Sequence, residues 1–355
     1  MKFKYRKRTR ALVGELSSWH GVGGAMDRDS WDQSGKQDAS HNASTDPQAT
    51  ETFLAEFAAL DLPSQRKRIR ELSEAEEENY SENRAPIYTM LMNHPDSEVR
   101  RCAVEAMWYY PDEEHLDRIL NTFWFDNDEE VRGRAAMVLG RYMYEAFVME
   151  ELDPPLAKRV KRALLETSSD EGESITVRRF ALEALSFCTD DPKVLNLIEQ
   201  GYFAPDQRMQ LSALFAMGRS GLERWHGYLL RALDESDKEF RIEAISACGE
   251  AQIISAVPEL QKMCFDMDRD IRLEAIWALG KIGDERALHT LQRCVRDVDP
   301  EVSEVAHDAI EELGIAAAIA RGEYTEALEE EDLMDFDADD DADWDDDSDA
   351  EDERE

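Results

Sequence analysis

The stretch DMDRDIRLEAIWALG, residues 266–280, contains the pattern that decides the fold. It opens on an apolar residue, Ile271, has alanine four residues later at Ala275 and again at Ala278, and ends in glycine. The apolar opening and the first alanine occur in seven copies, which begin at Val99, Val131, Val177, Met209, Phe240, Ile271 and Val302. Five of the six intervals are 31 or 32 residues long. A repeat of this length is typical of a solenoid, in which each unit buries its apolar face against its neighbours.

A second amphipathic helix follows each copy after a short turn. In the sixth unit the turn occupies 283–285, the second helix runs over about 287–295, and 297–300 supplies the N-cap and a first-turn proline for the next copy. The sustained alternation of a half-buried strand does not occur in the sequence. The pattern therefore predicts an all-α fold, a right-handed α-solenoid of helix pairs, with disordered tails at both ends.

Changes in composition divide the chain into four predicted segments. Residues 1–50 form a polar, disordered segment with a basic start, 51–93 a helical cap, 94–314 the repeat solenoid, and 315–355 a short helix followed by an acidic disordered tail. The third copy begins 46 residues after the second, so about 15 residues are inserted, and we expect them in loops on one face of the solenoid. The composition leaves Met1 and Met26 both open as the start.

The charge balance limits the classes of partner. The chain has 80 Asp and Glu against 41 Lys and Arg, a net charge of −39. Residues 329–355 contain 18 of the acids and one arginine, whereas the first ten residues contain six bases and no acid. The part between them is still acidic. Because nucleic-acid backbones are bound through Lys and Arg, we expect no nucleic acid on the solenoid.

The residues that usually carry chemistry are scattered. The five cysteines lie in helical patterns without a Cys-x-x-Cys pair, which predicts buried thiols in a reducing compartment. The seven histidines form neither His-x-x-His nor His-Glu-x-x-His. No run of 18 apolar residues is present. We therefore expect a cytoplasmic protein that is not an enzyme, with no catalytic residue, no cofactor, no metal and no membrane span.

Two copies, 266–280 and DNDEEVRGRAAMVLG at 126–140, closely resemble HEAT repeats, above all the short variety of phycobilisome-lyase-type proteins. The resemblance covers about 90–314 and implies a solenoid whose concave side is lined by the repeated helix. It implies little about chemistry, since such repeats occur in lyases, an iron-dependent hydroxylase, DNA-repair proteins and scaffolds. The hydroxylase relatives have His-Glu within the repeated helix, where this chain has Leu273-Glu274, Ile242-Glu243 and Leu211-Ser212.

A row of arginines follows the opening residue in five copies: Arg100, Arg132, Arg178, Arg241 and Arg272. An aspartate stands a few residues earlier in most copies, at Asp96, Asp128, Asp237, Asp268 and Asp299. The arginines could await an anionic ligand, or they could join each repeat to the next through carboxylates and helix caps. Because the aspartates recur with the arginines, the pattern favours a structural ladder.

Some residues opposite the core are apolar. On a helical wheel the third and seventh positions of each copy face away from the core and are polar or charged in most copies. The apolar residues at these positions are Leu211, Phe215, Ile242, Leu273 and Trp277. They would form a groove for a partner helix on the concave side, unless the curvature packs neighbouring helices over them. The sequence leaves both alternatives open.

These patterns favour a non-enzymatic scaffold that binds a protein partner, of unspecified identity, through its concave face. The acidic tail would be a solubiliser or a bait for a basic partner. The alternative, which rests on the family resemblance alone, is a HEAT-like enzyme such as a bilin lyase-type protein.

Overall fold

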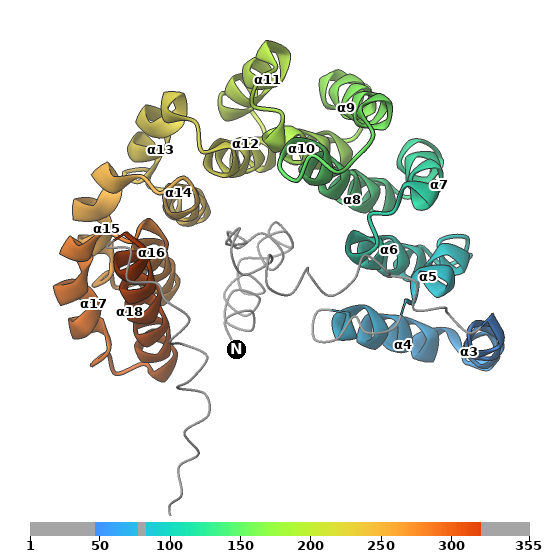
Figure 1. Ribbon diagram of the computed structural model, residues 1–355, viewed down its shortest axis with the longest axis horizontal. Coiled ribbons are helices and arrows are strands. Elements are labelled where there is room, and N and C mark those ends of the chain that lie inside the picture. The colour runs from blue at the N-terminus through green and yellow to red at the C-terminus, as the bar shows by residue number, and fades with distance from the viewer. Residues whose placement is uncertain (1–46, 77–82, 321–355) are drawn as a thin grey trace, which may run out of the picture.

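The computed structural model describes residues 47–76 and 83–320, and side chains as far as Gly314. All regular elements within these ranges are helices, stacked in pairs along an arc (Figure 1). The predicted all-α solenoid is therefore confirmed. Both predicted disordered tails lie largely outside the described residues, although the first helix begins at Pro47, four residues earlier than expected.

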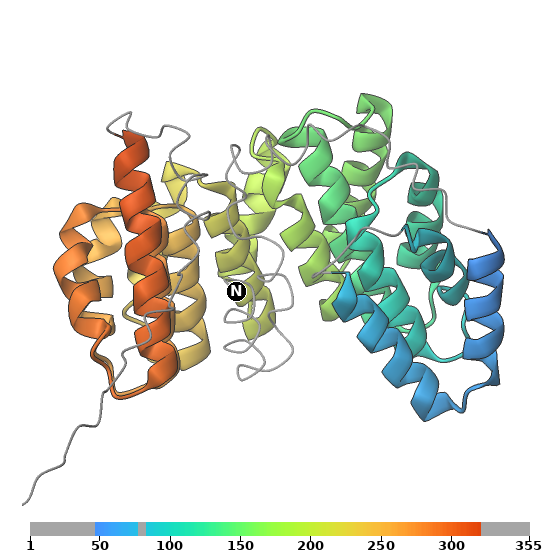
Figure 2. The same ribbon diagram turned by 60° about the horizontal axis from the view of Figure 1, so that its bottom comes forward.

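Each of the seven predicted copies forms one helix of the inner row of the arc (Figure 1). The inner helices are α6 (Ser97–Ala106), α8 (Glu129–Phe147), α10 (Ile175–Ala184), α12 (Gln207–Ser220), α14 (Lys238–Glu250), α16 (Arg269–Ile282) and α18 (Pro300–Ala320). The preceding helix α4 (Leu62–Ala75) extends this row at the N-terminal end. The turned view shows inner helices standing side by side (Figure 2).

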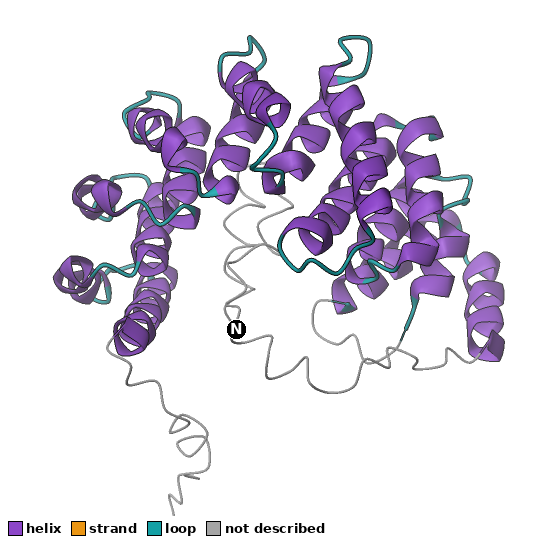
Figure 3. Cartoon of the chain, turned by 45° about the horizontal axis from the view of Figure 1, so that its top comes forward, coloured by secondary structure: helices purple, strands orange, loops and turns teal. Residues whose placement is uncertain are grey.

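The partner helices form the outer row. They are α3 (Pro47–Ala59), α5 (Ala85–Leu91), α7 (Glu113–Phe125), α9 (Pro154–Ser169), α11 (Pro192–Tyr202), α13 (His226–Ala232), α15 (Val257–Met263) and α17 (Leu288–Cys294). Short 3-10 turns link several pairs: η2 (Met107–Tyr109), η3 (Leu185–Phe187), η4 (Glu223–Trp225), η5 (Ile254–Ala256) and η6 (Glu285–Ala287). The loops gather at the two edges of the arc (Figure 3).

The core is a strip between the two rows. The opening apolar residue of every copy is buried, and the alanine four residues later has no exposed surface in any copy. Small residues also bring the inner helices together. A Cβ added at Gly218 would lie 2.6 Å from the Cα of Ala247 on the next inner helix, and one at Gly280 would lie 2.9 Å from the Cα of Ala309. Such contacts require glycine, because real Cβ atoms do not approach this closely.

Aspartates begin most of the inner helices. The side chains of Asp96, Asp128, Asp206, Asp237 and Asp268 all accept a backbone N–H of the first turn, as N-caps do. Two helices end on glycine in the left-handed conformation, α12 at Gly221 (φ 62°) and α16 at Gly283 (φ 70°). The register read from the sequence is therefore the register of the helices.

The insertion differs from the expectation. It lengthens helices: α8 has 19 residues against 13 or 14 in α12, α14 and α16, and α9 has 16 against 7 in α13. Only a short polar turn at 170–174 separates α9 from α10. Asp153 and the two prolines after it start α9, because proline suits the first turn of a helix.

Candidate interaction surface

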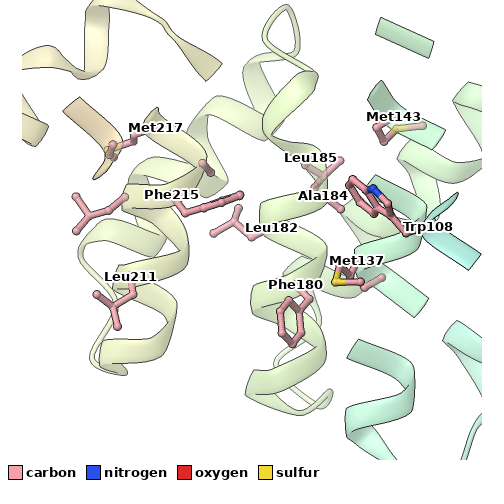
Figure 4. Close-up of a cluster of buried hydrophobic side chains, with 14 of the residues drawn as sticks. Trp108, Met137, Met143, Phe180, Leu182, Ala184, Leu185, Leu211, Phe215 and Met217 are labelled. Carbon is pink, nitrogen blue, oxygen red and sulfur yellow. The ribbon is translucent and has the colours of Figure 1, made fainter. Parts of the chain in front are cut away.

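The expected apolar groove is not an exposed surface. The exposed fractions are 7 % for Leu211, 6 % for Phe215, 5 % for Ile242 and 0 % for Leu273, and Trp277 is half-buried. Figure 4 shows Leu211 and Phe215 on one helix, with Phe215 pointing toward Leu182 on the adjacent inner helix. Four of the five side chains are therefore buried, and the alternative in which they are exposed is wrong for these four. The partner-binding role of the five residues stays a prediction.

Crowding of the inner helices explains this burial. Gly133 occupies the third position in its copy, and a Cβ there would lie 2.8 Å from the ring of Phe180 on the next inner helix. At the seventh position, the indole of Trp277 would be 2.9 Å from a Cβ on Gly249 of the preceding helix. Side chains at these positions thus lie against adjacent inner helices. The curvature of the arc covers them, which was the second alternative.

The predicted arginine ladder has different partners from those expected. The preceding aspartates are helix caps, and the arginines instead reach forward to acids that begin the next repeat. Arg100 forms two hydrogen bonds of 2.8 Å with Asp126, and Arg132 lies 2.7 Å from Glu173. Each also donates to a backbone carbonyl of its own loop.

The other three ladder arginines differ among themselves. Arg272 lies 3.5 Å from Asp297, and Arg178 donates to the carbonyl of Ser168 at 3.4 Å. The Nε of Arg241 is buried without a hydrogen-bond partner. The ladder joins repeats most strongly at its N-terminal end, where two arginines pair at hydrogen-bond distance with half-buried carboxylates.

A second set of ion pairs also joins repeats, and sequence reasoning missed it. Here a base near the start of one inner helix reaches the N-cap aspartate of the next. Arg66 pairs with Asp96 at 2.5 Å, Lys238 with Asp268 at 2.8 Å and Arg269 with Asp299 at 2.5 Å. The signal was present in the sequence as bases that precede these aspartates by 30 residues.

A buried polar cluster lies where α10 and α12 meet. The hydroxyl of Ser212 donates to Oε1 of Glu183 at 2.5 Å, and Arg179 lies 3.4 Å from the same oxygen. The guanidinium of Arg179 also covers the ring of Phe180 at 3.8 Å. Burial raises the pKa of Glu183 and lowers that of Arg179. Polar atoms of the three side chains are paired in part within the cluster, so the cluster is suited to holding α10 against α12.

A second polar centre joins the N-terminal cap to the repeats. Glu76 is fully buried and accepts hydrogen bonds from the hydroxyls of Tyr88 at 2.7 Å and Tyr110 at 2.8 Å, while Arg84 lies 3.1 Å away. Burial and the neighbouring carboxylate raise the pKa of Tyr88, and burial raises that of Tyr110. With all partners present, this network stabilises the junction of α4, α5 and the end of η2.

The charges of the inner surface are divided between its two halves. Inner-facing positions of α6 to α12 contain five arginines: Arg101, Arg134, Arg141, Arg179 and Arg219. Four of them form ion pairs with Glu105, Glu145 or Glu183 on the same row of helices, and arginines outnumber these acids. Inner-facing positions of α14 to α18 are rich in acids: Glu243, Glu250, Glu274, Glu304 and Asp308. The net acidity of the solenoid is therefore not spread evenly over this surface. Net charge reports a sum over the chain and cannot reveal this separation.

Exposed apolar side chains occur along one edge of the arc. Phe125, Phe203 and Phe265 are 72 %, 67 % and 45 % exposed, and each lies six residues before the opening residue of a copy. Phe125 is the last residue of α7, whereas Phe203 and Phe265 lie one and two residues after the ends of α11 and α15. Their common spacing could have been found by aligning the copies.

The chemistry-bearing residues stay dispersed in the described ranges, where no three His, Cys, Asp or Glu side chains form a metal-binding group. The five cysteines are buried and free. Burial raises the pKa of Cys188 and that of Cys248 to about 12. No helix of the described part has the length and apolar content needed to cross a bilayer.

A family model and several solved structures are similar to parts of this chain. A model of HEAT repeats matches residues 85–165 and 227–314. Similar solved structures include the CpcE–CpcF complex of phycocyanin lyase from Nostoc, with 16 % identity, 66 % of this chain and 98 % of that chain covered, and a TM-score of 0.43. Human deoxyhypusine hydroxylase is 17 % identical, with 76 % of this chain and 98 % of that chain covered and a TM-score of 0.33. The Kap95:Nup1 complex is 12 % identical, with 76 % of this chain and 40 % of that chain covered and a TM-score of 0.43. No curated protein sequence matches significantly.

The stacked helix pairs and the inner row of repeated helices define an α-solenoid. Residues 85–165 and 227–314 contain HEAT repeats, as the family match at both ends of the repeat region shows.

Proposed function

We propose that this protein is a non-enzymatic scaffold that binds a protein partner on the inner surface of its arc. The observation that carries the proposal is the division of charged residues along that surface, with arginines in excess and paired with glutamates on α6 to α12, and acids in excess on α14 to α18. A charge pattern that extends over several repeats is longer than a small molecule, and it suits a polypeptide of complementary pattern.

The charged side chains of the inner surface also differ in their burial and in their ion pairs. Arg101 forms an ion pair with Glu105 on its own helix at 3.3 Å and contacts Sγ of Cys102 at 3.8 Å, and the side chains of Arg101 and Glu105 are about one-third exposed. Glu304, at the matching position of α18, is exposed. Such side chains contribute little to folding, so they are available to steer and orient a partner.

The test uses charge reversals that leave the net charge unchanged. The variant R101E/E304K changes the inner surface, and K158E/E223K changes exposed positions associated with the outer row. Each protein is used to capture partners from the native host, and captured proteins are identified by mass spectrometry. We expect a partner retained by wild type and K158E/E223K and lost with R101E/E304K. Equal retention by all three proteins would refute an inner binding surface.

The enzymatic alternative makes a different prediction. A bilin lyase-type protein that carries its chromophore would absorb visible light, and a metal-dependent enzyme would contain stoichiometric metal. The absorbance spectrum and metal analysis of the purified protein therefore test the non-enzymatic part of the proposal. The role of the acidic tail as a solubiliser or bait stays a proposal, since residues 329–355 lie outside the described part of the chain.

A further inference from the structure

One carboxylate on the acidic half of the inner surface has an incomplete environment. Glu274 on α16 is only 4 % exposed, and its Oε1 has no hydrogen-bond partner. The buried carboxylate Glu183 on α10 differs in this respect, because it accepts a hydrogen bond from Ser212 and lies beside Arg179. Among the described residues, no base forms an ion pair with Glu274. A buried carboxylate without a donor is costly, so this position favours an added cation.

The surroundings of Glu274 strengthen this preference. Glu243 and Glu250 on α14, and Glu304 and Asp308 on α18, occupy inner-facing positions of the two adjacent helices. Lys281 on α16 is a basic residue at an inner-facing position of these three helices, and it donates a hydrogen bond to Glu312 at 3.2 Å. Acids on three successive inner helices make this half of the surface negative, and a negative surface attracts a ligand with several positive charges.

An aromatic side chain accompanies the acids. Trp277 lies one helical turn after Glu274 on α16 and is half-buried. Its indole rests over Gly249 of the preceding inner helix. Carboxylates beside a partly exposed indole are well suited to arginine and lysine, which pair with the carboxylates and stack on the ring. The site thus favours a short basic peptide over a single metal ion.

We propose that the acidic half of the inner surface, formed by α14, α16 and α18, binds the chain's own basic segment at residues 2–10. This inference rests on the proposed function of the inner surface. The segment KFKYRKRTR contains six bases, two aromatic residues and no acid in an otherwise acidic chain. Charge complementarity therefore selects it above any other part of the sequence.

The tether allows this contact. Thirty-six residues separate Arg10 from Pro47, where the first helix begins. A chain of that length reaches at most about 120 Å, so it does not restrict where the segment binds. A tethered segment has a high effective concentration at its site. A basic partner must therefore displace residues 2–10 before it binds, and the segment acts as a built-in competitor.

The test follows the segment in the full-length protein. Thr9→Cys provides a site for a fluorophore, because the five native cysteines are buried. Fluorescence anisotropy is measured for three backgrounds: wild type, E243Q/E274Q, and the control E113Q/E223Q, which removes two exposed acids beside the outer row. Helicity and melting temperature establish that each variant folds. The single variant E243Q repeats the test at a half-buried position, in case E274Q impairs folding.

The proposal predicts high anisotropy in wild type that does not depend on protein concentration and falls as salt is raised to about 0.5 M. E243Q/E274Q should lower the ratio of docked to free segment about tenfold or more, and the control should change it less than about twofold. An unlabelled peptide of residues 1–12 should displace the label.

Two results would overturn the proposal. If the anisotropy is low in wild type, or is the same in E243Q/E274Q, the segment does not occupy this site. Peptide binding that depends on Glu243 and Glu274, together with a free tethered label, would refute occupation by the chain's own segment. Neither result bears on partner capture, which R101E/E304K tests separately.

Discussion

At the scale of residues, Leu273 shows how the arc changes the meaning of a helical position. It lies opposite the core of its own helix, yet it has no exposed surface. The inner helices approach so closely that a Cβ at Gly249 or at Gly280 would lie 2.9 Å from the Cα of an alanine on the next helix. A side chain that an isolated helix would expose is therefore covered by its neighbours.

Phe215 provides a direct test of this burial. The variant F215A should cost about 3–5 kcal/mol of unfolding free energy, because it removes a ring that is 6 % exposed and stacks on Arg219 at 4.6 Å. The control F203A removes a ring that is 67 % exposed and should cost less than about 1 kcal/mol. Urea denaturation measures both. Similar costs would show that Phe215 is not packed as described.

Glu183 predicts a pH dependence of stability. Burial raises its pKa above the ordinary value of 4.5, so its stabilising contribution is present below pH 4.5 and is lost as pH rises through the raised pKa. E183Q stays neutral throughout. The unfolding free energy of E183Q minus that of wild type should therefore increase from pH 4.5 towards pH 8. A difference that stays constant over this range would contradict a raised pKa for Glu183.

At the scale of elements, glycines set the distance between inner helices. G218A should cost about 1–3 kcal/mol, because the added Cβ would meet Ala247 on the next helix at 2.6 Å from its Cα. The matched variant G227A, in the outer helix α13 with nothing within 4 Å of its added Cβ, should stabilise the protein by up to about 1 kcal/mol. Thermal melts of the two variants should shift in opposite directions, and a shared direction would contradict the close packing.

Sequence periodicity predicted the elements well and their lateral contacts poorly. The alanine at the fifth position of each copy marks the core, because helix register is a local property. The partners of Arg100 and Arg132 lie in the next repeat, and their identity depends on how the repeats are rotated. The same rotation covers Leu273, so neither feature follows from a single helical wheel. The insertion between the second and third copies lengthened α8 and α9, because its residues continue a helical pattern.

At the scale of the whole molecule, charge is distributed very unevenly. Residues 329–355 contain 18 acids in 27 residues, a composition too charged to bury a core. We therefore expect that deletion of 329–355 leaves helicity and the melting transition almost unchanged, and raises the melting temperature slightly at low salt by reducing self-repulsion. A large fall in melting temperature would instead show that the tail packs on the solenoid.

The central claim is that a protein partner binds the inner surface of the arc, and site-specific photo-crosslinking tests it most directly. A photoreactive residue replaces Arg101 or Glu304 on inner helices, or Lys158 or Lys193 on the outer helices α9 and α11. After irradiation in the native host, the account predicts a covalent adduct with the same protein from both inner positions and from neither outer one. Adducts from the outer positions alone, or equally from all four, would contradict it.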